Sequence, residues 1–145
     1  MATGRLHNRI DLIWSGDHYE ETRSNAICYP GTLGLLNSAG LIGPHGTAGT
    51  IYAIMIIMHQ QKLGKIITDT WASGTLVSWV TPQPGDVFNM LLESVEDVGL
   101  DDFLTVTTSG SLKVATSTDR RLFQPLEVLT GTGSGDRFCK CRFIG

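Results

Sequence analysis

The residues with the clearest potential for chemistry are the three cysteines, Cys28, Cys139 and Cys141. Two thiolates spaced as C-x-C could bind a metal ion, with Cys28, His45 or His59 completing a tetrahedral site. Zinc sites usually combine pairs spaced as C-x-x-C or H-x-x-x-H, whereas two cysteines that alternate along an apolar strand behave as small buried side chains. We therefore expect neither a metal ion nor any other cofactor.

A glycine-rich loop at residues 131–135 and the scattered histidines are the other candidates for chemistry. A phosphate-binding loop is followed by a helix, but this loop leads into the strand-like sequence FCKCRFIG. No G-x-S-x-G elbow accompanies the histidines, and His45 is expected in a turn with a structural or exposed role. Carboxylates at residues 93–102 would need a cleft before they could act as an acid-base pair. These observations predict that the protein is not an enzyme.

A stretch of alternating strands and turns, residues 65–94, is the element around which the chain is organised. Its turns are predicted at Ser73-Gly74 and at the sequence Pro-Gln-Pro-Gly-Asp of residues 82–86, where Pro84 presets φ and Gly85 can take a positive φ. The pattern predicts two or three strands of a rigid scaffold, in which Trp79, Val87 and Leu91 help to fill the interior.

Further short strands are expected along the rest of the chain, because apolar runs repeatedly end at Gly, Pro, Asn or Ser. The run at residues 50–58 indicates a central strand covered on both faces, although its pattern also allows a helix. The final strand places Cys139, Cys141 and Phe143 on the face expected to be the inner one. The predicted strands are residues 26–29, 33–36, 41–42, 50–58, a hairpin of 104–106 with 112–115 that turns at Ser109-Gly110, 124–129 and 138–144.

Composition indicates one many-turned all-β domain: 145 residues, 41% hydrophobic, 17% charged and 17 glycines. We predict a small β-barrel-like domain over residues 26–145, preceded by an extended N-terminal arm over residues 1–25. A net charge of −3 disfavours general nucleic-acid binding. The longest apolar run, residues 51–58, is much shorter than the ~20 residues that span a bilayer. The odd number of cysteines, without a secretory segment ahead of them, favours synthesis in a reducing compartment.

The arm is one candidate binding surface, because its polar sequence also carries apolar residues. Either the arm docks on a partner or its apolar residues pack on the chain's own core. The residues expected to bind a partner are Arg5, Leu6, Arg9, Ile10, Leu12 and Trp14.

Two regions of opposite charge are the second candidate. Residues 86–102 contain Asp and Glu but no Lys or Arg, whereas the C-terminal strand is basic. Either the two regions meet, within a subunit or across a subunit boundary, or both stay solvated. The candidate subunit-interface residues are Arg137, Lys140, Arg142, Glu96, Asp97 and Asp101.

Several motifs follow one another in a familiar order. They are L-x-x-x-G-L-I-G-P-H-G at residues 36–46, G-K-I-I-T-D-T-W-A-S-G-T-L-V at 64–77, P-G-D at 84–86, V-G-L-D-D-F-L at 98–104 and S-G-S-L at 109–112. Over residues 26–144, this succession resembles the capsid decoration, or cement, proteins of tailed double-stranded DNA bacteriophages.

The resemblance implies a β-barrel-like or β-tulip domain that forms a homotrimer on the outer surface of the virion capsid. The arm would grip the major capsid protein, and the trimer would clamp neighbouring capsomers against the pressure of packaged DNA. The implied partners are the major capsid protein and other copies of the chain, with no nucleic acid and no membrane, after synthesis in the host cytoplasm.

A different class remains open, a small β-barrel module that binds a carbohydrate or a peptide on a virion or cell surface. Tyr52, Trp71, Trp79 and Phe88 could line a sugar platform, although aromatic residues at strand spacing more often lie in the core. A third class, a small hydrolase, would need a cleft with perturbed titratable groups.

Overall fold

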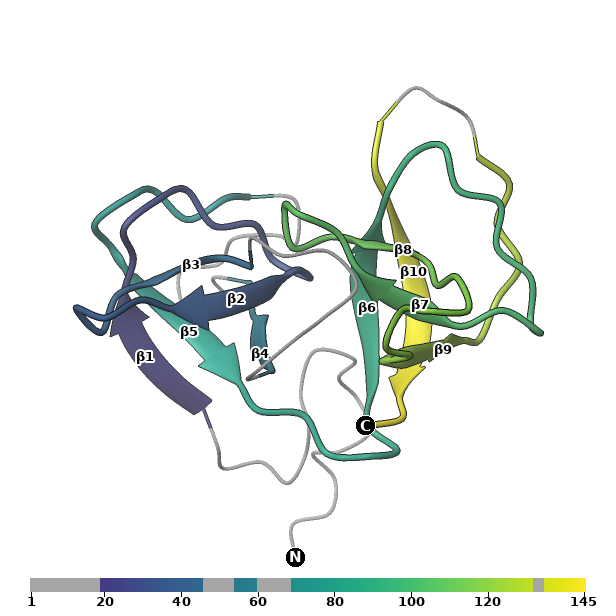
Figure 1. Cartoon of the computed structure of the whole chain (residues 1–145). Coiled ribbons are helices and arrows are strands. Elements are labelled where there is room, and N and C mark those ends of the chain that lie inside the picture. Colours follow the sequence, from purple (N-terminus) through teal and green to yellow (C-terminus); the bar gives the residue numbers. More distant parts are fainter. Residues whose placement is uncertain (1–18, 46–53, 60–68, 132–134) are drawn as a thin grey trace, which may run out of the picture.

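A computed structural model describes residues 19–45, 54–59, 69–131 and 135–145 (Figure 1). These residues form ten strands and no helix, which confirms the predicted all-β class. The described ranges accordingly contain no helix of the length and hydrophobicity that a membrane crossing requires. Five strands form a sheet in the order β1-β5-β4-β2-β3, and five form a closed barrel in the order β10-β6-β8-β7-β9, as Figure 1 shows side by side.

The strand bounds follow the chain from the sheet into the barrel. The sheet contains β1 (Tyr19–Arg23), β2 (Leu33–Leu36), β3 (Ile42–Pro44), β4 (Met55–Ile57) and β5 (Leu76–Val80). The barrel contains β6 (Val87–Leu92), β7 (Leu104–Val106), β8 (Leu112–Val114), β9 (Phe123–Pro125) and β10 (Arg137–Phe143).

The sheet is rolled, so that its two edges meet. β1 pairs antiparallel with β5 over its whole length, from Tyr19 opposite Val80 to Arg23 opposite Leu76. Directly after β1, Ser24 forms a bridge with Ile42 of β3, the strand at the other edge. The amide of Asn25 donates a 3.0 Å hydrogen bond to the Ile42 carbonyl at the same place. This seam leaves little of the β3 edge open to another chain.

The sheet buries apolar side chains on both faces. One face carries a core cluster of Cys28, Ile42, Met55, Ile57, Trp71, Val77 and Trp79. The other face contributes Leu33, Ile56, Met58 and Val80 to the core of the barrel. β4 lies in the middle of the sheet and is buried throughout, as expected for a central strand; residues 50–53 of the predicted strand lie outside the described residues.

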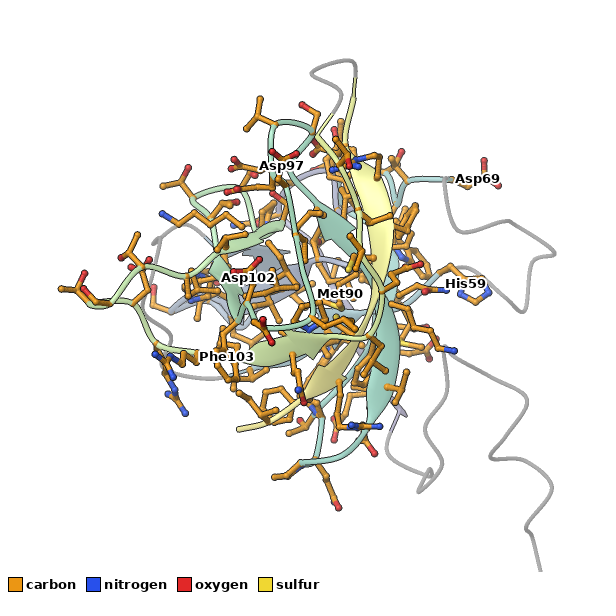
Figure 2. All side chains as sticks on the ribbon, turned by 90° about the vertical axis from the view of Figure 1, so that its right-hand side faces the viewer. His59, Asp69, Met90, Asp97, Asp102 and Phe103 are labelled. Carbon is orange, nitrogen blue, oxygen red and sulfur yellow. The ribbon has the colours of Figure 1, made fainter. Side chains whose placement is uncertain are left out.

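The barrel interior follows the two-residue period of its long strands. In β10, Cys139, Cys141 and Phe143 point inward, which confirms the predicted inner face. In β6, Phe88, Met90 and Leu92 are the buried residues, and Met90 is labelled inside the barrel in Figure 2. The prediction that Val87 and Leu91 fill the interior is wrong, because they lie on the opposite, half-buried face of β6. Trp79 is buried, but in the cluster of the sheet.

Two glycines join the sheet to the barrel. Gly31 donates a 2.9 Å hydrogen bond to the Ile57 carbonyl of β4 and accepts a 2.8 Å bond from the Leu91 amide of β6. Gly110, in the β7–β8 turn, accepts a 2.9 Å bond from the Leu33 amide of β2. Both glycines have positive φ, 79° and 90°. A Cβ would lie 2.9 Å from the Asn89 carbonyl oxygen at Gly31 and 2.6 Å from the Leu33 carbonyl oxygen at Gly110. Both positions therefore require glycine.

Three hydroxyl groups stiffen the β7–β8 turn. Oγ1 of Thr107 lies 2.9 Å from Oγ of Ser111 and 3.1 Å from Oγ of Ser109, and the two serine hydroxyls are 3.2 Å apart. Thr107 and Ser111 are buried, whereas Ser109 is exposed. This turn, predicted at Ser109-Gly110, is confirmed, as is the turn at residues 82–86, where the Asp86 amide donates to the Gln83 carbonyl at 3.0 Å.

Other predicted strands differ from the observed ones. Residues 26–29 form only a single bridge, Cys28 with Trp71, because the chain leaves the sheet there to reach Gly31. The strand predicted at 124–129 is β9, which begins one residue earlier and ends at Pro125. Residues 65–68, at the start of the central stretch, lie outside the described residues.

The last residues of the predicted arm belong to the sheet. Tyr19–Arg23 form β1, and Ser24 and Asn25 form the seam with Ile42. The polar sequence of these residues pairs through its backbone, which leaves the charged side chains of Glu20, Glu21 and Arg23 exposed. Residues 1–18 lie outside the described residues.

Candidate functional site

Two loops, residues 94–102 and 126–131, cross one end of the barrel and are here called the end loops. They run antiparallel: the Val98 amide donates to the Leu129 carbonyl at 2.8 Å, and the Leu129 amide donates to the Val98 carbonyl at 3.0 Å. The side chain of Val98 is buried against the barrel core. Figure 2 views this end of the molecule, with Asp97 and Asp102 marking the first of the two loops.

Polar side chains fix the end loops to each other and to the barrel. Arg137, at the start of β10, donates from Nη2 to the Glu96 carbonyl at 2.9 Å and from Nη1 to the Thr130 carbonyl. Oδ1 of Asp97 accepts a 2.6 Å hydrogen bond from the Gly131 amide. Oε1 of Glu96 accepts a 3.3 Å bond from the Val114 amide of β8. The end loops are thus held in one shape before any partner binds.

The outer surface of the end loops combines apolar and anionic side chains. Val95, Leu100 and Val128 are 69%, 55% and 65% exposed, and the side chains of Asp97 and Asp101 are exposed among them. Exposed apolar side chains mark an interaction surface when they are contiguous and rimmed by polar residues. The sequence pattern indicated the acids but not these three apolar residues, whose signal is that each stands directly beside an Asp or Glu residue in the sequence.

The outer face of β10 carries the opposite charge. Lys140 and Arg142 are exposed there, and their side chains make no hydrogen bond with other described residues. The half-buried Phe138, on the same face, precedes them. Val87 and Leu91 of the paired strand β6 are also half-buried on this face. This basic face therefore mixes two cations with partly exposed apolar surface.

The predicted interface residues occupy three different settings. Arg137 and Glu96 meet within one chain, although through the Glu96 carbonyl rather than its carboxylate. Asp97 is hydrogen-bonded within the end loops. Asp101, Lys140 and Arg142 are exposed, and no ion pair joins them to each other within the described residues. The arm residues Arg5, Leu6, Arg9, Ile10, Leu12 and Trp14 lie outside the described residues.

Three carboxylates gather behind the first end loop. Burial raises the pKa of Glu93, and the nearby carboxylates of Glu96 and Asp136 raise it further, while Lys113 acts in the opposite direction. Oδ1 of Asp136 also accepts a 3.2 Å hydrogen bond from the Ser94 amide. Burial and the repulsion between these carboxylates thus both disfavour the ionised form of Glu93.

The cysteines lie in two separate cores. Cys28 is in the cluster of the sheet, whereas Cys139 and Cys141 are in the barrel, and all three are free and buried. Burial raises the pKa of Cys28 and of Cys139 to about 11, and it raises the pKa of Cys141 well above its ordinary value. Within the described ranges, no three His, Cys, Asp or Glu residues lie close enough to hold a metal ion.

His45 has the structural role, which was one of the two roles expected for it, structural or exposed. It follows β3 directly, is fully buried, and its amide donates a 2.9 Å hydrogen bond to the Leu33 carbonyl. It lies there because the chain passes beside the sheet-barrel junction, where its amide nitrogen would be 3.4 Å from a Cβ at Gly110. This is the structural role that the sequence allowed.

Three of the four aromatic residues considered for a sugar platform are described by the structure, and all three are buried. Trp71 donates from Nε1 to the Met58 carbonyl at 2.7 Å, and Trp79 donates from Nε1 to Oγ1 of Thr22 at 2.9 Å. Phe88 lies in the barrel core. Tyr52 lies outside the described residues. These three described side chains serve packing, and none of them presents a ring face to solvent.

No known protein family matches the chain, and no curated protein is significantly similar to it in sequence.

Proposed function

We propose that the protein is a structural capsid decoration protein, which binds the outside of a tailed-phage head as a homotrimer and stabilises the lattice of the major capsid protein. The order of sequence motifs supports this proposal, and a rigid all-β body agrees with it. Because one fold can serve several functions, the point at which the binding residues are attached carries more weight than the fold itself.

The observation that carries the proposal is the position of β1. This strand directly follows residues 1–18, which contain Arg5, Leu6, Arg9, Ile10, Leu12 and Trp14. β1 is held by its five-residue ladder with β5, by the bond from Trp79 to Thr22, and by the seam at Ser24. A segment attached at this point passes any force on it directly into the sheet.

A trimer would strengthen such a contact without further chemistry. Each copy contributes one arm, and linked arms bind with an avidity well above the affinity of one arm. Weak individual docking is therefore compatible with stable attachment to a lattice that repeats the same site.

Removing residues 1–18 tests the proposal while leaving β1 in place. We expect the truncated protein to keep its fold and its oligomeric state, and to lose co-sedimentation with expanded capsids assembled from the major capsid protein that is encoded with it. Circular dichroism and sedimentation velocity check the first two properties. Full capsid binding by the truncated protein would contradict the proposal.

Trp14→Ala is the sharper variant, since tryptophan is among the residues enriched at the hot spots of interfaces. We expect docking to weaken by about 2 kcal/mol, or roughly thirtyfold in Kd, if Trp14 is the anchor. Trp14→Phe is the matched control, because it keeps an aromatic ring and should retain most of the affinity.

The carbohydrate- or peptide-binding module is distinguished by mass and by ligand response. A trimer in solution whose melting temperature does not respond to sugars favours the decoration function. A monomer that melts at a higher temperature with a sugar favours the module.

A further inference from the structure

We propose that the end loops of one copy dock on the outer face of β10 of a second copy, so that the chain associates head to tail. The inference deepens the proposed decoration function, on whose trimer it rests, by naming the two surfaces that meet. Both surfaces lie entirely within the described residues.

The end loops have the properties of a docking surface. Their backbone is fixed by the Val98–Leu129 bridge and by Arg137, so docking would cost little ordering. They project Val95, Leu100 and Val128 beside the exposed acids Asp97 and Asp101. Such a surface needs a partner that is cationic and partly apolar.

The outer face of β10 has these properties. Lys140 and Arg142 stand two residues apart on one face of the strand, and their side chains have no hydrogen-bond partner among the described residues. The half-buried Phe138 precedes them on the same face, and Val87 and Leu91 flank them on β6. Charge complementarity would set the register of the contact, and apolar burial would supply most of its affinity.

Within one chain the two surfaces adjoin at Lys140 and separate toward Arg142. The Lys140 carbonyl accepts a 2.8 Å hydrogen bond from the Leu126 amide, and the Lys140 amide donates a 2.7 Å bond to Oε2 of Glu127, both in the second end loop. The end loops lie at the Arg137 end of β10, whereas Arg142 lies five residues farther along, roughly 17 Å at the strand rise. Arg142 is paired with Val87, close to the turn at residues 82–86, and the Gly85 amide donates to the Phe143 carbonyl at 2.8 Å. The end loops therefore reach the Arg142 part of this face only on another copy.

A contact between two different surfaces is heterologous, and it closes into a ring when the rotation between copies allows. A ring of three copies would use every end-loop surface and every β10 face once. The contact would also weaken as salt increases, because its charged groups are at the rim.

Charge reversal tests the contact by sedimentation equilibrium, in solution and without capsids. Asp101→Arg is preferred over a change at Asp97, because Asp97 holds the Gly131 amide. Its partner variant is Lys140→Glu with Arg142→Glu. Each is expected to raise the dissociation constant of the oligomer about tenfold or more. The chain with all three changes is expected to recover part of the association and to bind more tightly than either single-surface variant, because the cation introduced at position 101 then faces the anions introduced at positions 140 and 142.

Matched controls separate the contact from general effects. Glu20→Lys reverses an exposed charge on β1, and Ile27→Ser removes an apolar side chain that is 50% exposed outside the end loops. Both are expected to leave association unchanged, whereas Val128→Ser is expected to weaken it.

Three results would overturn the inference: an unmodified chain that is monomeric, single-surface reversals that associate normally, or a combined variant that fails to recover. Loss of capsid binding in the arm truncation tests a different contact. A chain that follows the charge-reversal pattern but never binds capsids would refute the decoration function and leave this interface standing.

Discussion

The backbone amide of Leu33 donates a 2.9 Å hydrogen bond to the carbonyl of Gly110, and this bond joins the rolled sheet to the turn of the β7–β8 hairpin. Two parts of the fold that are far apart in sequence are thereby fixed to each other. The bond depends on a close approach of two backbones, which only glycine permits at position 110.

Gly110→Ala is expected to destabilise the protein by about 3 kcal/mol, because the new Cβ would lie 2.6 Å from the Leu33 carbonyl oxygen and φ is 90°. Gly40→Ala is the control for φ alone: its φ is 79°, but a Cβ there meets nothing within 4 Å. That control should cost only about 1 kcal/mol. Urea denaturation measures both, and equal losses would show that the close approach at Gly110 has no importance.

Ser111→Ala tests the hydroxyl cluster of the same turn. Removing the buried Ser111 hydroxyl takes away the 2.9 Å partner of Thr107, so stability should fall by about 1 kcal/mol. Ser109→Ala removes an exposed hydroxyl of the same cluster and should change stability by less than about 0.5 kcal/mol. Thermal denaturation of the two variants in parallel measures their difference in stability. Equal stabilities would show that the buried hydroxyl pair contributes nothing.

The thiols are expected to be unreactive in the folded protein. With a pKa of about 11, only about one in a thousand molecules of Cys28 or Cys139 is a thiolate at pH 8, and burial blocks access as well. Alkylation by iodoacetamide, followed by intact mass, should therefore label the chain only after a denaturant is added. Rapid labelling of native protein would contradict the buried positions.

The same thiols predict a loss of stability in alkali. The folded state holds these protons more tightly than the unfolded state, whose thiols have the ordinary pKa of 9.0. The free energy of unfolding should thus decrease as pH rises above this value and through about 11. Cys28→Ala and Cys139→Ala should each reduce that decrease relative to their own stability at neutral pH.

Glu93→Gln tests the repulsion behind the end loops. The pKa of Glu93 is raised, so its ionised form costs stability above the folded pKa, and this cost disappears as pH falls below the ordinary pKa. The variant should melt slightly higher than the unmodified protein at neutral pH, and the gain should disappear in acid. Glu20→Gln, which removes an exposed charge on β1, controls for net charge. A gain that persists in acid would point to packing instead.

The face of a strand that points inward could be predicted where apolar and polar residues alternate along it. The inner face of β10 was predictable because Cys139, Cys141 and Phe143 alternate with charged residues. The face of β6 was predicted wrongly because Val87 to Leu92 is apolar at every position except Asn89. Asn89 shares its face with Val87 and Leu91, so this single polar residue was the only sequence indication of which face of β6 is the outer one.

Long-range pairing was beyond local patterns. The polar sequence of β1 reads as an arm, since its pairing with β5 uses backbone groups that every residue has. The seam between Ser24 and Ile42 likewise has no sequence signal. At the candidate surface, the acids and the basic strand were predictable from charge. The hydrogen bond from Arg137 to the Glu96 carbonyl could not be predicted, because every residue has a backbone carbonyl and the residue type does not show which one accepts.

The seam that closes the sheet beside Ser24 gives the domain a preferred direction of mechanical strength. Tension applied along β1 from its first residue would load the ladder with β5 in shear, so that several hydrogen bonds must rupture together. Tension applied across the strand would instead peel the bonds apart one at a time. A tether that leaves the domain at Tyr19 would therefore be most resistant when it is pulled parallel to β1.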